Sequence, residues 1–171
     1  MFYTAGDPMG KACSILVHNF HTGREEALSG SPSDAHDIDI SPDGKWLVFL
    51  NREVGEEKRR IRRIRIMPTS GGAPREIYSF EMEGNYVISP AWSADGRFIY
   101  FYNMSGSSED SWNLYRVSVD GGEAQKIDLT MAGFRHLSVH PDGQHLAFSS
   151  IGTNPQQSQV WVMENFLPKE K

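Results

Sequence analysis

The chain has 171 residues, a net charge of −5 and hydrophobic residues at 39% of its positions. This composition is too apolar for a disordered chain, and no apolar run approaches the roughly 20 residues that span a bilayer. The acidic balance gives no long-range attraction to a phosphate backbone, so we expect neither membrane insertion nor a nucleic-acid partner. A single cysteine, Cys13, excludes an internal disulfide and a multi-cysteine zinc site. We expect one domain over residues 1–171, without a cofactor.

A tight turn followed by an apolar run occurs three times along the chain. The copies are Ser41-Pro42-Asp43-Gly44, Ser93-Ala94-Asp95-Gly96 and His140-Pro141-Asp142-Gly143. Proline presets φ at the second position, aspartate tolerates the next corner, and glycine takes a positive φ. The aspartates lie 52 and 47 residues apart, a spacing typical of a four-stranded β unit. We therefore interpret six residues as structural corners of hairpins: Asp43, Gly44, Asp95, Gly96, Asp142 and Gly143.

The expected strands can be placed in chain order around these turns. The first unit, residues 1–30, has strands around Phe2–Thr4, Ile15–Asn19 and Glu25–Leu28. The second, residues 36–80, has Trp46–Leu50, Arg63–Met67 and Arg75–Phe80 after its inner strand. The third, residues 86–130, has Phe98–Tyr102, Asn113–Val119 and Ala124–Leu129. The fourth, residues 134–168, contains Leu146–Phe148 and closes with Val160–Pro168.

Each complete unit has four antiparallel strands, which is the composition of a β-propeller blade. Turn spacing predicts three strands in the first unit, four in the second and third, and three in the fourth. We therefore expect an all-β fold, a partial propeller of about 3.5 four-stranded blades, with almost no α-helix. Propellers close with about four to eight blades, so we expect a homodimer or additional N-terminal blades to complete the ring.

The segment Ser41–Lys45 with its aromatic-aliphatic strand, and the closing segment Val160–Pro168, resemble the WD-repeat-like propellers of bacterial TolB-type proteins. Similar repeats form the propeller halves of dipeptidyl-peptidase-type and oligopeptidase-type enzymes and the sensor halves of some bacterial kinases and regulators. The resemblance implies a non-catalytic scaffold for a protein or peptide partner, such as a sensor module of a larger bacterial protein. The alternative is the accessory, substrate-gating propeller of a peptidase-like serine hydrolase whose catalytic domain is absent.

The resemblance also implies a periplasmic location for a secreted parent protein. The chain as it stands shows no basic segment followed by an apolar stretch at its start, so it would stay in the cytoplasm. The sequence leaves the compartment open between these two.

No residue pattern indicates catalysis or metal binding. The chain has no Gly-x-Ser-x-Gly elbow, and Ser105–Ser108 lacks the strand and helix that such an elbow requires. His136, His140 and His145 cluster around the third turn. Along a strand, residues four apart are separated by about 13 Å, too far to share one ion, so we expect no metal site.

In a propeller the first strand of each blade lines the central channel. This geometry brings seven binding candidates to the channel: Asp37, Asp39, Ser89, Trp92, Arg135, His136 and Ser138. The alternative for each is packing within a blade or solvation in the channel. We assign seven aromatic residues to packing between blades: Trp46, Phe49, Phe98, Phe101, Tyr115, Phe148 and Trp161.

A basic segment, Lys58–Ile66, carries six positive charges. It could be an anion-binding patch. The interpretation we favour is a half-exposed strand, because Ile64 and Ile66 alternate with Arg63 and Arg65 and several glutamates precede the segment.

Overall fold

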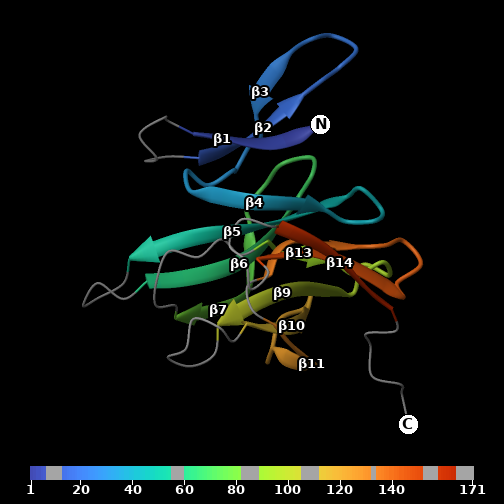
Figure 1. Ribbon diagram of the computed structural model, residues 1–171. Helices are drawn as coiled ribbons and strands as arrows, with labels where there is room; N and C mark the ends of the chain where they lie inside the picture. Colours follow the sequence, from blue (N-terminus) through green and yellow to red (C-terminus); the bar gives the residue numbers. More distant parts are fainter. Residues whose placement is uncertain are drawn as a thin grey trace.

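The computed structural model describes residues 1–6, 13–54, 60–81, 89–104, 112–131, 134–151 and 158–164. These residues form antiparallel strands in four sheets and contain no helix (Figure 1). Accordingly, this part of the chain has no helical segment of the length and apolarity that a bilayer crossing requires. The expected all-β class is confirmed.

The four sheets follow one another along the chain. The first contains β1 (Phe2–Gly6), β2 (Cys13–His18) and β3 (Glu25–Ala27). The second contains β4 (Ala35–Ile40), β5 (Trp46–Val54), β6 (Arg60–Pro68) and β7 (Arg75–Glu81). The third contains β8 (Ala91–Trp92), β9 (Phe98–Met104), β10 (Trp112–Ser118) and β11 (Gln125–Met131). The fourth contains β12 (Phe134–Val139), β13 (His145–Ile151) and β14 (Ser158–Glu164). Three, four, four and three strands are the numbers that the turn spacing predicts.

The Asp-Gly turns have the local structure that their residue types favour. The Ser41 hydroxyl donates to Asp43 Oδ1 at 2.6 Å and accepts the N–H of Trp46 at 2.9 Å. The second turn repeats both contacts at the same two distances. The corner glycines have nearly identical positive φ values, which residues with a Cβ adopt only with strain: 71° at Gly44, 70° at Gly96 and 70° at Gly143. The three turns are thus equivalent corners.

The first strands of three sheets meet inside the molecule. β4 contacts β8, and β8 contacts β12, although each belongs to a different sheet. β4 and β12 each contain a bulge at the same place, after His36 and after Arg135. Asp37 and His136 lie in these bulges with a φ of 50°, an uncommon value for residues other than glycine. Nothing in the residue pattern predicts the bulges.

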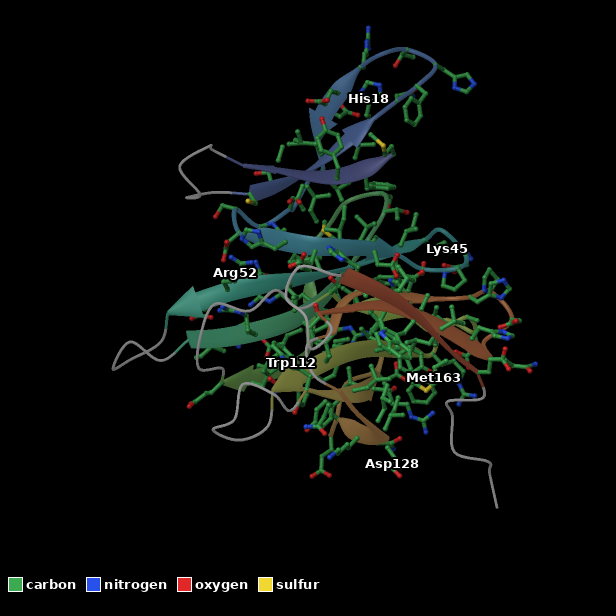
Figure 2. The ribbon with its side chains drawn as sticks, viewed as in Figure 1. His18, Lys45, Arg52, Trp112, Asp128 and Met163 are labelled. Atoms are coloured by element: carbon green, nitrogen blue, oxygen red, sulfur yellow. The ribbon has the colours of Figure 1, made fainter. Side chains whose placement is uncertain are left out.

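Side chains fill the space between neighbouring sheets (Figure 2). Phe101 on β9 is 1% exposed and stacks on Phe80 of β7 at 5.7 Å and on Tyr115 of β10 at 5.6 Å between ring centres. Such packing buries large apolar areas between blades. The packing assignment is wrong for Trp46 and Trp161, which are 38% and 46% exposed. Trp46 opens β5 directly after its turn, and Trp161 lies on β14, which pairs only with β13 among the described strands.

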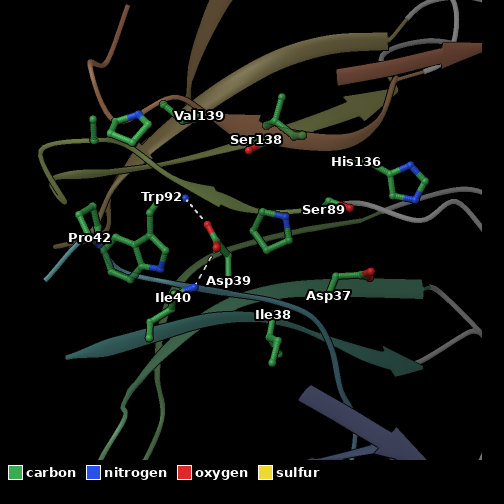
Figure 3. A pocket seen from close by; sticks show the side chains of 14 residues that line it. Asp37, Ile38, Asp39, Ile40, Pro42, Ser89, Trp92, His136, Ser138 and Val139 are labelled. Atoms are coloured by element: carbon green, nitrogen blue, oxygen red, sulfur yellow. Dashed lines mark hydrogen bonds between the residues drawn. The ribbon is translucent and has the colours of Figure 1, made fainter. Parts of the chain in front are cut away.

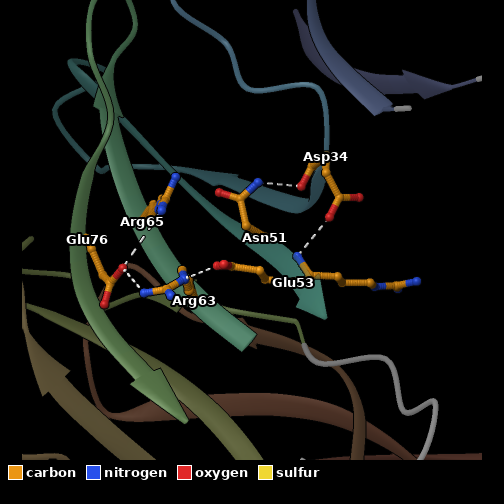
Figure 4. Close-up of polar contacts among 7 residues, drawn as sticks. Asp34, Asn51, Glu53, Arg63, Arg65 and Glu76 are labelled. Atoms are coloured by element: carbon orange, nitrogen blue, oxygen red, sulfur yellow. Dashed lines mark hydrogen bonds and ion pairs between the residues drawn. The ribbon is translucent and has the colours of Figure 1, made fainter. Parts of the chain in front are cut away.

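The basic segment forms much of β6, and two of its arginines, Arg63 and Arg65, have acidic partners. Arg63 Nε lies 2.6 Å from a Glu53 oxygen, and its Nη1 lies 2.7 Å from Glu76 (Figure 4). Arg65 lies 3.8 Å from the same Glu76 oxygen. These pairs across neighbouring strands confirm the half-exposed strand. Lys58 and Arg59 fall outside the described residues.

Candidate binding site

A pocket of about 630 Å³ lies where β4, β8 and β12 meet (Figure 3). In each of these three blades, the residues that line the pocket lie one to six positions before the aspartate of the Asp-Gly turn. The lining residues are Asp37–Ile40, Pro42, Ser89, Pro90, Trp92, Ala94, His136–Val139 and Pro141. We call this cavity the inner-strand pocket. The three blades contribute equivalent positions to the lining, because the inner strand and turn of each blade lie in the same way toward the centre of the propeller.

Six of the seven candidates from the sequence line this pocket: Asp37, Asp39, Ser89, Trp92, His136 and Ser138. Asp37, Ser89 and His136 occupy the same position in their three blades, six residues before the turn aspartate. The seventh candidate, Arg135, lies in β12 opposite Ser149, and its side chain falls outside the described residues. The structure therefore brings the candidates together, and their part in binding stays a prediction.

Asp39 joins two blades. One carboxylate oxygen accepts the N–H of Ile40 at 2.9 Å, and the other accepts the N–H of Trp92 at 2.9 Å. Burial raises the pKa of Asp39, and the two N–H donors oppose that rise. Because both oxygens already have backbone partners, we interpret Asp39 as the link between β4 and β8 instead of a ligand contact.

The end of the pocket that carries Asp37, Ser89 and His136 is polar (Figure 3). The Asp37 carboxylate accepts no hydrogen bond from any described residue, and its burial raises its pKa. The positive charge of Arg52 opposes that rise, as do His36 and His136. Asp37 can therefore accept hydrogen bonds from a molecule that enters this end.

His136 forms a hydrogen bond to a serine outside the pocket lining. Its Nδ1 lies 3.1 Å from Ser149 Oγ, and the described residues show no hydrogen bond between His136 and the pocket serine Ser89. A hydrolytic triad is recognised by a hydrogen bond between nucleophile and base and by a third group that orients the base. Ser89 and His136 do not form such a pair in this structure.

The opposite end of the pocket is apolar and contains an unpaired donor. Its lining includes Trp92, Pro42 and Val139, which lie away from Asp37 and His136 (Figure 3). The Trp92 side chain is 5% exposed, and its indole Nε1 has no hydrogen-bond partner among the described residues. A buried donor left unpaired costs about 1–3 kcal/mol.

Three prolines, Pro42, Pro90 and Pro141, also line the pocket. The sequence predicts the position of Trp92 but not that of these prolines. Pro42 and Pro141 precede the aspartates of their turns, where proline by itself indicates only turn formation.

No protein-family model matches the chain. The Tol-Pal system protein TolB of Francisella tularensis is 27% identical over 79 residues, which are 46% of this chain and 18% of TolB. The uncharacterized peptidase YuxL of Bacillus subtilis is 30% identical over 111 residues, 64% of this chain and 16% of YuxL. The chain thus spans less than a fifth of the length of these relatives.

Several solved propellers share the fold. TolB from Acinetobacter baumannii superimposes with a TM-score of 0.70 at 18% identity, over 96% of this chain and 38% of that one. Putative TolB from Agrobacterium tumefaciens gives 0.66 at 21% identity, over 96% and 58%. The β-propeller domain of the Trilobed protease from Pyrococcus furiosus gives 0.56 at 14% identity, over 99% and 52%. Together with the repeated turns and the three and a half blades, these likenesses give the chain the all-β fold of TolB-type β-propellers, of which it spans a part.

Proposed function

We propose that this chain is a non-catalytic propeller scaffold that binds an extended peptide, or an extended segment of a protein, in the inner-strand pocket. The observation that carries the proposal is the pocket itself, in which three blades bring a polar end and an apolar end together. Stacked sheets hold such a site rigidly while neighbouring loops vary. The same fold in proteins named TolB supports a scaffold that serves as a module of a larger bacterial protein.

The chemistry of the pocket suits a peptide. Asp37 offers an acceptor for backbone N–H groups at the polar end, and Trp92 offers apolar surface at the other. A peptide carries backbone N–H groups as well as apolar side chains and can serve both ends at once. Pro42, Pro90 and Pro141 provide rigid apolar walls for its side chains. The volume of about 630 Å³ falls within the usual range for ligand pockets.

An array of immobilised peptides of random sequence, probed with the labelled full chain, tests the proposal. Asp37→Asn removes the negative charge and His136→Asn removes the imidazole, and asparagine tolerates the positive φ at both positions. We expect Asp37→Asn to bind the selected peptides about tenfold more weakly, because a hydrogen bond to a charged acceptor is stronger than one to an amide. We expect His136→Asn to weaken binding to a similar extent, because it loses the imidazole contact. Asp128→Asn is the matched control, because it removes the same charge from exposed β11 (Figure 2). Equal binding by all three variants would show that the pocket is not the site.

A second candidate function rests on the peptidase-related likenesses. The relative named peptidase YuxL and the propeller domain of the Trilobed protease support an accessory propeller that gates substrate for a separate serine hydrolase domain. The coding sequence on either side of this chain distinguishes the two functions. A hydrolase domain in frame supports the gating function, whereas a kinase or DNA-binding domain supports the sensor scaffold. Peptidase or esterase turnover by the chain alone contradicts both.

We also propose that the blades form a single domain that completes its ring with a second copy or with further blades. The TolB likeness supports a periplasmic location for the parent protein. Native mass spectrometry of the full chain measures the first point, since a dimer indicates closure by a second copy. A monomer indicates closure by further blades of the parent.

A further inference from the structure

The third Asp-Gly turn differs from the other two at two positions. The first two turns carry serine two residues before the aspartate and an aromatic residue three residues after it. The third turn has histidine at both positions, His140 and His145, around Asp142. The serine cap of the sister turns is thus replaced by two imidazoles beside the same carboxylate.

The turn brings these three side chains together. His140 Nδ1 lies 3.0 Å from Asp142 Oδ2, and His145 Nδ1 lies 2.6 Å from the same oxygen. Three possible ligand atoms, one from each residue, lie within 4.8 Å of one another. The expectation that the histidines of this turn are too far apart is therefore wrong for His140 and His145. The separation of residues along one strand does not describe this pair, because His140 lies before the turn and His145 after it, so the two face each other across a hairpin.

The carboxylate is held in place for this arrangement. Asp142 Oδ1 accepts the N–H of Gln144 at 2.8 Å and that of His145 at 3.2 Å, which leaves Oδ2 toward the imidazoles. The sister turns hold their aspartates in the same way, but only this turn adds nitrogen donors.

A further carboxylate lies behind one of the imidazoles. Glu164 on β14 is 3.6 Å from His145 Nε2, the ring nitrogen that points away from Asp142. Histidines that bind metals through one nitrogen usually direct the other toward a carboxylate or carbonyl, which fixes the tautomer. The 2.6 Å contact between His145 Nδ1 and Asp142 Oδ2 holds the ring proton on Nδ1, so a bound ion would displace that proton, and Glu164 lies on the side where Nε2 would then carry it.

We propose that the third turn is a binding site for a divalent transition-metal ion of the zinc class, with ligands His140 Nδ1, His145 Nδ1 and Asp142 Oδ2. Two imidazoles and one carboxylate suit zinc, copper or nickel, whereas calcium and magnesium prefer oxygen donors. Solvent completes the coordination, because His140 is exposed. The ion would stabilise the third turn, whose Pro141 lines the inner-strand pocket. The metal site does not depend on peptide binding in that pocket.

Titration of the tag-free full chain with zinc chloride in a calorimeter tests this site. We expect one zinc ion per chain. The double variant His140→Ser with His145→Phe restores the serine and phenylalanine of the second turn, so it retains a turn that this fold already uses. We expect it to bind zinc at least a hundredfold more weakly, since even indirect partners of a metal ligand account for about 10–100-fold in affinity.

His21→Ala is the matched control, because His21 is an exposed histidine of the first sheet's loop. It should bind zinc as the wild type does. The proposal is overturned if the wild type binds zinc no more tightly than the double variant, or if His21→Ala causes the same loss. Magnesium chloride is the second probe, and magnesium binding as tight as zinc binding would also overturn the assignment.

Discussion

Ser41 holds the first Asp-Gly turn with two hydrogen bonds made by one hydroxyl group. It donates to Asp43 and accepts the N–H of Trp46, and the residue is only 5% exposed. Water therefore has little access to replace the hydroxyl as a partner. At the level of single residues, the turn depends on the capping side chain of Ser41 as well as on the glycine that supplies the positive φ.

We predict that Ser41→Ala lowers the free energy of unfolding by about 1–2 kcal/mol, because it leaves the Trp46 N–H without its partner. Urea denaturation followed by circular dichroism measures this. Ser79→Ala on β7 is the control, since Ser79 is exposed, and its effect should stay within about 0.5 kcal/mol. Equal losses in the two variants would contradict the capping role.

Asp37 offers a test of charge burial in the inner-strand pocket. Burial raises its pKa, so the folded state favours the neutral acid and the ionised form costs stability. The stability associated with the protonated carboxyl is present at low pH and is lost as the pH rises through the pKa of the folded state. We predict that Asp37→Asn raises the urea midpoint at neutral pH, although it weakens peptide binding.

The difference between Asp37→Asn and the wild type should shrink as the pH is lowered through the pKa of Asp37, because both side chains are then neutral. Urea midpoints measured across this pH range check the sign. A variant that is less stable than the wild type at neutral pH would show that the Asp37 charge stabilises the fold.

At the scale of elements, β6 shows how one strand serves a buried and an exposed face. Ile64 is fully buried in the core, whereas Arg63 pairs with Glu53 and Glu76 on the partly exposed face. The alternation follows the two-residue period of a strand. Burial of the isoleucines contributes more to stability than the exposed ion pairs do.

We predict that Ile64→Ala costs about 2–5 kcal/mol of unfolding free energy, because it leaves a cavity in the core. Arg63→Met should cost less than about 1 kcal/mol, since exposed ion pairs contribute little. Thermal unfolding of both variants measures the contrast. A larger loss for Arg63→Met than for Ile64→Ala would be incompatible with this account of β6.

The repeated Asp-Gly turns allowed the strands to be placed from residue types alone, because glycine and proline have strict local preferences. Strand lengths were predicted less well. β5 runs on through Asn51–Val54, which pairs with Arg60–Arg63 although both stretches are polar. Cross-strand pairing stabilises such polar ends, and a single sequence gives no sign of it. The bulges at Asp37 and His136, which orient residues of the pocket, also have no signal in the sequence.

At the scale of the whole molecule, the four sheets are joined by two apolar clusters. The larger cluster runs from the second sheet to the fourth, and the smaller joins the first sheet to the second. β14 is an edge strand of the fourth sheet, and two of its valines are largely exposed, Val160 at 80% and Val162 at 63%. An exposed apolar edge strand is a site at which chains associate.

We predict that Val162→Lys reduces self-association of the full chain, because a charge on an edge strand opposes pairing with another chain. Light scattering over a concentration series measures this. The control, Ser79→Lys, adds the same charge on β7. Equal scattering by the two variants would show that the chains do not associate through β14.

In the proposed function, equivalent inner-strand positions of three blades form one peptide-binding pocket. Amide chemical shifts of the ¹⁵N-labelled full chain, recorded while a peptide selected on the array is added, test this most directly. We expect the largest shifts at the amides of residues 37–40, 89, 92 and 136–139 together, which line the pocket. Shifts confined to the outer strands β7 and β11, with the inner strands unchanged, would contradict it.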